Sequence, residues 1–446
     1  MTATVIKNVK IFDGSGEAPF PGSVRVEDNR IVAVERGDKS LASGDARVID
    51  GEGGTLMPGM VDAHAHLALG TSVETLTKKP GNHPAETLAL IEAHCGRVML
   101  DHGFTSAYSG GSGSVEAEVA VKEAFDAGWL PGPRLVTSSF ERMPGGPVGL
   151  VFKFPGYETR KSHPEEIGAF VEEMANKGAQ AVKFLLNGVS AFDPGKNTTE
   201  QFYDEEVMAA GEAARRKGVW LTAHCYTPHS IKLAIAAGFR TLYHCNYADE
   251  EALDAIEAAK DRIFVGLAPG IEESHVLRAK KFGVMASPEQ VEEQDSAIEH
   301  IKVTGNELRK RGVRSMIGGD YGFPWNPVGM NARDLELFVD WFGYTPTEAL
   351  VAATKLGGQI MDMEDELGLI KPGYLADVLV VRGDPVKDIT LMTRKENLAV
   401  IMKDGKAPQR HGAGRGGLQV KWITVDGAHP STPVLWARRK KYRADC

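Results

Sequence analysis

Residues 56–66 of this chain read LMPGMVDAHAH, an apolar run that ends in one carboxylate and two imidazoles. Side chains alternate across a β-strand, so residues two apart share a face. If the run is a short strand, His64 and His66 lie together at its end, close to Asp62, and can donate nitrogen atoms to one metal ion. A surface or capping role is the other interpretation of each histidine. The stretch therefore indicates a chelating pair, which the rest of the chain must support.

The bulk composition is that of a globular protein with more than one core. The chain has 446 residues, of which 42% are hydrophobic and 25% charged, and its formal net charge is −9. This charge disfavours nucleic acid as a partner. No apolar run reaches membrane-spanning length, and the four cysteines form no disulfide or CxxC pattern. We expect a cytoplasmic protein that binds neither nucleic acid nor membrane.

The two ends of the chain share an alternating apolar and polar pattern. It occurs at residues 4–12, 23–26 and 31–35, and it returns at 376–381 and 398–405. Such alternation is typical of half-buried antiparallel strands. Because similar ends flank a long unlike middle, we expect one small β-sandwich built from both termini.

The middle of the chain alternates apolar strands with helical segments, which is typical of βα units. Helix-forming stretches include 205–217, 231–237 and 250–259. The expected strands are 61–66, 105–109, 134–138, 181–186, 220–225, 241–245, 263–267 and 315–320. Eight such units predict an α/β fold, a (β/α)8 TIM barrel whose chemistry lies at the carboxyl ends of the strands.

These patterns predict four segments. Residues 1–58 are the first part of the β-sandwich and 59–365 the catalytic barrel. Residues 366–408 complete the sandwich, and 409–446 form a C-terminal extension with a glycine-rich start and a basic end.

Metal-competent side chains stand at the predicted strand ends, namely His64, His66, Lys183, His224, His244 and Asp320. Each has an ordinary alternative. His224 and His244 suit a core, Asp320 suits a helix cap, and Lys183 suits a snorkelling surface position. All six together at strand ends are poorly explained in this way, and the set favours a metal centre.

Lys183 lies in the apolar run 181–186, where an unpaired ammonium is costly. Carbamylation of its amine by CO2 would make it an anionic ligand able to bridge two cations. Asn187, four residues on, is the alternative ligand or a supporting amide.

The chain resembles the amidohydrolase superfamily over residues 1 to about 408. Within it, the chain is most similar to the branch of imidazolonepropionase, prolyl and arginyl dipeptidases, and phenylurea and molinate hydrolases. Besides the ligand positions, the motifs that carry the resemblance are PGMVDAHAH (58–66), GGD (318–320), TPTEAL (345–350), LGLIKPGYLADVLVV (367–381) and GDP (383–385).

The resemblance implies a binuclear metal centre. His64, His66 and Asp320 would hold the buried ion, His224 and His244 the outer one, and carbamylated Lys183 would bridge them. Nitrogen and oxygen ligands of this mix suit Zn²⁺ best, with Mn, Co or Fe as alternatives. The count of one or two ions stays open.

A hydroxide formed on the metal would attack a carbonyl, with Asp320 as the proton shuttle and His244 and Lys183 completing the catalytic set. This predicts hydrolysis of a C–N bond in an amide, urea or carbamate. Ring deamination needs a glutamate soon after His224, and residues 225–230 contain none. The alternatives are a lactonase or esterase, an Xaa-Pro or Xaa-Arg dipeptidase or N-acyl amino acid hydrolase, and a non-catalytic scaffold.

Specificity is expected in the loops 139–161 and 321–330, which are rich in aromatic residues. We expect substrate contacts from Phe152, Phe323 and Trp325, and from Asn187, Tyr226 and Tyr247, which follow ligand strands. These rings favour an N-aryl urea or similar xenobiotic amide. Arg142, Lys153, Arg160 and Lys161 would instead suit a carboxylate, as in a dipeptide. The superfamily resemblance also implies a homo-oligomer.

Overall fold

The computed structural model describes residues 3–37, 41–75, 83–144, 146–147, 163–191, 195–285 and 287–407. Met1–Pro408 form one compact unit with mixed α/β structure. Phe152, the three cationic positions at 153, 160 and 161, and the extension 409–446 lie outside the described residues. A search of the described helices for one that is long and apolar enough to span a membrane finds none.

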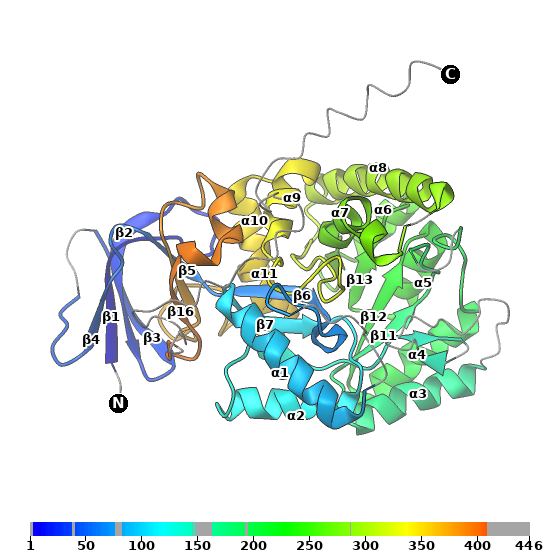
Figure 1. Ribbon diagram of the computed structural model, residues 1–446, viewed down its shortest axis with the longest axis horizontal. Helices are drawn as coiled ribbons and strands as arrows, with labels where there is room; N and C mark the ends of the chain where they lie inside the picture. Colours follow the sequence, from blue (N-terminus) through cyan, green and yellow to red (C-terminus); the bar gives the residue numbers. More distant parts are fainter. Residues whose placement is uncertain are drawn as a thin grey trace, which may run out of the picture. The chain divides into compact units, whose positions relative to one another are not determined.

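The strands from the two ends of the chain belong to one seven-stranded sheet, shown in blue and orange in Figure 1. The order is β16-β15-β5-β1-β2-β3, and β4 pairs with β1. Ile6, Val24, Leu56, Val378 and Val380 share one apolar core. Strands from the two ends of the chain thus lie in one sheet. The strands are β1 (Ala3–Ile11), β2 (Phe20–Glu27), β3 (Arg30–Arg36), β4 (Arg47–Asp50), β5 (Thr55–Pro58), β15 (Val378–Val381) and β16 (Leu398–Met402).

The middle of the chain contributes two further sheets that carry the predicted site. One has the order β6-β7-β8 and the other β10-β9-β11-β12-β13-β14. All their pairings are parallel except that of β9 with β10. The bounds are β6 (Met60–Ala65), β7 (Phe104–Ser109), β8 (Arg134–Val136), β9 (Arg142–Met143), β10 (Gly146–Pro147), β11 (Ala181–Leu185), β12 (Trp220–Cys225), β13 (Thr241–His244) and β14 (Phe264–Gly266).

Isolated parallel bridges connect these two sheets at both ends. Ser138 bridges to Ala181, Val265 to Ser315, and Ala65 to Tyr321. Seven of the eight strands predicted for this region are present. The prediction of a continuous strand over 315–320 is wrong, because only the bridges at its two ends form.

The interruption at 315–320 has a local cause. A side chain at Gly318 would lie 2.5 Å from the backbone nitrogen of His64, so the segment passes unusually close to β6. Asp320 then has a φ of 60°, which a regular strand does not permit. The ladder is lost where Asp320 turns.

Helices follow most strands, as the sequence pattern predicted. They are α1 (Ala85–Asp101), α2 (Val115–Asp126), α3 (Pro164–Asn176), α4 (Asp204–Lys217), α5 (Pro228–Ala237), α6 (Glu250–Ala258), α7 (Pro269–Leu277), α8 (Pro288–Lys310), α9 (Arg333–Phe342), α10 (Pro346–Ala353) and α11 (Lys355–Ile360). In Figure 1, α1 to α5 lie around the strands of the two parallel sheets. The 345–350 motif begins α10: Thr345 and Glu348 form a reciprocal capping box, and Pro346 occupies the first turn.

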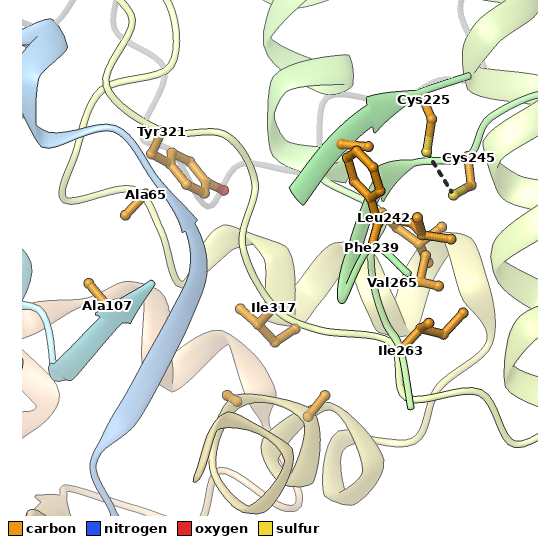
Figure 2. Packing of buried hydrophobic residues seen from close by; sticks show 14 of the residues in the cluster. Ala65, Ala107, Cys225, Phe239, Leu242, Cys245, Ile263, Val265, Ile317 and Tyr321 are labelled. Atoms are coloured by element: carbon orange, nitrogen blue, oxygen red, sulfur yellow. Dashed lines mark hydrogen bonds between the residues drawn. The ribbon is translucent and has the colours of Figure 1, made fainter. Parts of the chain in front are cut away.

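The ends of β12 and β13 carry packing residues next to the predicted ligands. Figure 2 shows the thiols of Cys225 and Cys245 directed toward one another, with the sulfur atoms 4.0 Å apart. Both are fully buried in the same core as Leu242 and Val265. Each cysteine follows a predicted ligand in the sequence, yet its side chain serves the apolar core.

Candidate active site

Residues from distant parts of the chain meet at the carboxyl ends of the parallel strands. His64 lies near the end of β6, His244 ends β13, and Asp320 follows the interrupted segment. Each offers a ligand atom within 4.8 Å of those of the other two. His66 joins them through its Nε2 atom, which lies 3.0 Å from Oδ1 of Asp320. The arrangement brings together four of the six predicted ligands.

The other two predicted ligands extend this cluster. The Nζ atom of Lys183 lies 3.2 Å from Nε2 of His64 and 3.4 Å from Oε1 of Glu141. It also donates to the carbonyl oxygen of Gly110 at 3.0 Å. The ring of His224 packs edge-on against that of His244, with centroids 4.5 Å apart. All six side chains therefore form one continuous group.

Backbone geometry at two strand ends directs the ligands inward. His244 has a φ of 73° and Asp320 a φ of 60°. These left-handed conformations cost about 1–3 kcal/mol each for residues other than glycine, and they cluster at functional sites. Tyr243, next to His244, stacks on the ring of His64 at 3.6 Å and donates to the carbonyl oxygen of Ala63 at 2.8 Å.

Three of the imidazoles are neutral and keep an unused ring nitrogen. Burial lowers the pKa of His64 and His244 well below the usual value and that of His224 to about 3. Nδ1 of His64, Nε2 of His224 and Nδ1 of His244 are buried and have no hydrogen-bond partner within the described residues. Buried ring nitrogens without a partner are costly, and a cation that accepts the lone pair of a neutral imidazole would compensate for this cost. This donor set fits a divalent metal.

His66 and Asp320 give a second sign that a cation suits this site. Nδ1 of His66 lies 3.0 Å from the carbonyl oxygen of Gly111, which requires an N–H at that position. A neutral His66 would then direct the Nε2 lone pair at the Asp320 carboxylate. Burial lowers the pKa of His66, but the contact with Asp320 outweighs it and raises the pKa overall. A proton or a metal ion must therefore lie between the two groups.

Two more buried carboxyl groups hold the ligand segments in place. Asp62 accepts from the backbone nitrogen of His64 at 2.8 Å and from Nδ2 of Asn331 at 2.6 Å. Asp334 accepts from the backbone nitrogen of Gly318 at 3.0 Å and from the Tyr321 hydroxyl at 2.8 Å. Asp334 thus forms hydrogen bonds with residues on both sides of Asp320.

The pattern of residues 55–407 matches the family model described as Amidohydrolase family. The chain belongs to this family. It is therefore a hydrolytic enzyme that acts on small molecules, and members of the family generally bind divalent metals. The resemblance inferred from the motifs is confirmed.

Three named proteins are similar to this amidohydrolase. Ochratoxinase from Aspergillus niger is 26% identical over 92% of this chain and 88% of its own length. A prolidase solved with N-methylphosphonate-L-proline has a TM-score of 0.78 and 23% identity, covering 91% of this chain and 99% of its own. Phenylurea hydrolase B has a TM-score of 0.69 and 20% identity, covering 92% and 97%. The two structures show a shared fold.

The predicted substrate residues of the amidohydrolase lie at different distances from the cluster. Tyr226 contacts it, with its ring 4.5 Å from that of His224. Phe323 lies 6.2 Å from His66 and stacks on Trp325 at 5.2 Å. Tyr247 is farther out, 6.1 Å from Tyr226 between ring centroids.

Asn187 is engaged in holding loops together. Its Oδ1 accepts from the backbone nitrogen of Tyr226 at 2.6 Å and from the Ser230 hydroxyl at 2.7 Å, and its Nδ2 donates to Glu200 at 3.1 Å. The position at the end of β11 is the predicted one. These bonds give the amide a structural role beside the site.

Sequence reasoning missed several residues around the ligands. Tyr243 and Glu141 each contact a ligand, and Asp334 bonds to Gly318 and Tyr321 on either side of Asp320. None of the three stands in a recognisable ligand spacing. For Tyr243 the adjacent His244 was the available signal, but strict strand alternation would place it on the opposite face. Only the left-handed turn at His244 brings both residues to the site.

Proposed function

We propose that this amidohydrolase uses a divalent cation, zinc by preference, to hydrolyse the C–N bond of an amide, urea or carbamate. The observation that carries the proposal is the group of buried neutral imidazoles with unused nitrogen atoms beside Asp320. Nitrogen and oxygen donors in this mixture suit zinc, with manganese, cobalt or iron as alternatives.

The proposed ligands divide into two sets. His64, His66 and Asp320 would hold one ion, and His224 with His244 a second. Lys183, which is 1% exposed, would lie between the sets. Reaction of its neutral amine with CO2 forms an N–C bond and releases one proton, which gives a carbamate able to bridge both ions. The 3.2 Å approach to His64 supports this placement.

The bound cation supplies Lewis acidity toward a water molecule and toward the substrate carbonyl. Burial would raise the pKa of Asp320, but the surrounding histidines, with the hydrogen bond from His66 among them, outweigh it, so the pKa is well below its usual range. Asp320 is thus an ionised base that can take the proton from water and pass it to the departing nitrogen.

Tyr226 is the proposed hydrogen-bond donor to the carbonyl oxygen. Its ring lies 4.5 Å from His224 and 5.1 Å from His244. Burial, reinforced by Glu272, raises the pKa of its hydroxyl well above the usual value. The hydroxyl therefore keeps its proton at neutral pH. It hydrogen-bonds to Glu272 in this structure, and it would turn from that carboxylate to stabilise charge that develops on the substrate oxygen.

The favoured substrate is uncharged and carries an aromatic group, as in an N-aryl urea or related amide. Phe323 and Trp325 form a stacked pair beside His66. Arg142, the described candidate for binding a carboxylate, lies instead with its guanidinium 5.3 Å from the ring of Phe170 in α3. This position favours packing against the helix layer.

We also infer that the circuit of bridges described above closes a (β/α)8 barrel over 59–365. In this proposal residues 1–58 and 366–408 form a β-sandwich. Hydrogen bonds from the backbone nitrogen of Ala63 to Ile317 and from that of Met316 to Val265, both 2.8 Å, support closure through the interrupted eighth segment.

The test is a substrate screen of the purified enzyme after dialysis and reconstitution with zinc. Phenylureas, aryl amides, N-acyl amino acids, dipeptides and lactones are compared by kcat/KM. We expect the highest value with an aryl amide or phenylurea. Turnover of lactones alone would overturn the proposed C–N specificity.

A further inference from the structure

His275 is a buried histidine near the proposed site that belongs to none of the predicted ligand sets. It lies on α7, after β14, and is 7% exposed. Its neighbour Ser274 donates a hydrogen bond to Oδ1 of Asn326 at 2.7 Å. Nδ2 of Asn326 in turn donates to the carbonyl oxygen of Asp320 at 2.9 Å. His275 is therefore held in a fixed position relative to Asp320.

A chain of hydrogen bonds determines which nitrogen of His275 carries the proton. It begins at Glu272, which is buried and accepts through Oε1 from Nδ2 of Asn246 at 2.7 Å. Through Oε2, Glu272 accepts from Nε2 of Gln294. Both carboxyl oxygens are thus acceptors for amide N–H groups, which fixes the orientation of the Gln294 amide.

The orientation of Gln294 is passed to His275. With Nε2 of Gln294 on Glu272, the Oε1 atom faces Nδ1 of His275 at 3.2 Å. Because an amide oxygen only accepts, Nδ1 must carry the hydrogen. Burial lowers the pKa of His275 to about 4, so the ring is neutral near pH 7 and Nε2 keeps a lone pair.

The ring that carries the remaining nitrogen lies near Trp325, one of the proposed substrate contacts. In the described part of the chain, no group forms a hydrogen bond with Nε2 of His275. The ring centroid of His275 is 6.1 Å from that of Trp325. The ring is near enough to Asp320 and His244 for the charge of Asp320 to raise the pKa of His275, and for a charge on His275 to lower the pKa of His244. A histidine with a fixed tautomer and a free acceptor nitrogen therefore lies next to Trp325.

We propose that Nε2 of His275 accepts a hydrogen bond from an N–H group of the substrate, so that the enzyme selects secondary amides and N–H ureas over their N-alkylated forms. This inference rests on the proposed function, since it concerns the substrate of the same site. His275 is a specificity residue in this account, and Glu272 and Gln294 are positioning residues that act through it.

The tautomer is tested first, without any substrate. Ring nitrogens of the ¹⁵N-histidine-labelled, zinc-loaded enzyme are observed by NMR, and the His275 signals are assigned from their loss in His275→Gln. We expect a neutral ring with the hydrogen on Nδ1, and a mixture of tautomers in Gln294→Leu. An Nε2-protonated ring in the unsubstituted enzyme would overturn the proposal, whether or not hydrolysis is detected.

Selectivity is then tested with acetanilide and N-methylacetanilide. We expect the ratio of their kcat/KM values to favour acetanilide and to fall about threefold to tenfold in His275→Gln and in Gln294→Leu, as for loss of one neutral hydrogen bond. His94→Gln, a histidine in α1 bonded to Ser72 and Thr75, should keep the ratio unchanged. An unchanged ratio in His275→Gln would refute the proposal, whereas failure to hydrolyse either anilide while lactones are turned over would refute the proposed function.

Discussion

Two buried carboxyl environments in this protein differ in their neighbours. Asp320 lies among histidines, and its pKa is well below the usual range despite burial. Glu92 of α1 and Glu118 of α2 lie among apolar and hydroxyl groups, and burial raises the pKa of both, that of Glu118 to about 7. Neither oxygen of Glu92 has a hydrogen-bond partner in the described residues.

The difference shows that burial alone does not make a carboxyl group a metal ligand or a base. Desolvation disfavours the charged form in both places. Only at Asp320 do nearby imidazoles outweigh desolvation, so that the charged carboxylate is favoured. Glu118 accepts from the Ser109 hydroxyl at 2.7 Å and from the Ser138 backbone nitrogen at 2.6 Å, and these neutral donors do not compensate for burial beside a second carboxyl group.

The largest expected effect comes from removing the charge at each place with an isosteric amide. Asp320→Asn should lower kcat by about 10²–10⁴-fold, the range for loss of a general base, and further if metal is lost. Glu92→Gln should leave kcat unchanged, because burial favours the neutral form of that carboxyl group, which the amide resembles. Steady-state kinetics on both variants, with circular dichroism to verify folding, checks this. Equal loss of activity in the two variants would erase the proposed distinction.

Asp334 is an intermediate case that sharpens the comparison. It is buried, hydrogen-bonded on both sides of Asp320, and burial raises its pKa to about 8. Asp334→Ala frees the segment 318–321 and should lower kcat by about 10–100-fold, the usual cost of losing an outer-shell partner. Asp334→Asn should retain more activity, since its amide oxygen still accepts one bond. Should both variants match the parent enzyme, Asp334 does not position Asp320.

The glutamate pair predicts a pH dependence of stability. The folded-state pKa of Glu118 is about 7, above its ordinary value of 4.5, so the native protein holds this proton more tightly than the unfolded chain. The contribution is fully present below about pH 4.5 and is lost as the pH rises toward 7. Glu118→Gln should show a smaller decline in unfolding free energy between pH 5 and 8, measured by urea denaturation. Parallel declines in the two proteins would contradict this linkage.

The smallest effect is expected at Cys225, which is adjacent to His224 but directed into the core. Cys225→Ala should leave kcat unchanged and lower the free energy of unfolding by about 1 kcal/mol, as for removal of one buried methyl-sized group. Kinetics and urea denaturation on the same preparation check both parts. Loss of turnover with intact folding would mean that the thiol has a chemical role.

The sequence was most informative where a residue type and a regular spacing coincide. The pair His64 and His66, two residues apart, and His224 near the end of β12 follow from strand alternation. His244 ends β13 as expected, but it reaches the site through its left-handed backbone. The interrupted segment before Asp320 could not be predicted, because its apolar residues resemble those of a strand and the break depends on contact with β6. Tyr243, Asp334 and His275 were missed because their roles arise from tertiary contacts between segments far apart in the chain.

The most direct test of the account is the metal content of active enzyme. Freshly purified protein is analysed by elemental mass spectrometry beside His244→Ala, with hydrolysis measured on the same samples. We expect at least one divalent transition metal ion per chain, lost together with activity on chelation and restored by zinc, and reduced in His244→Ala. Full activity in protein that contains no such metal would contradict the account.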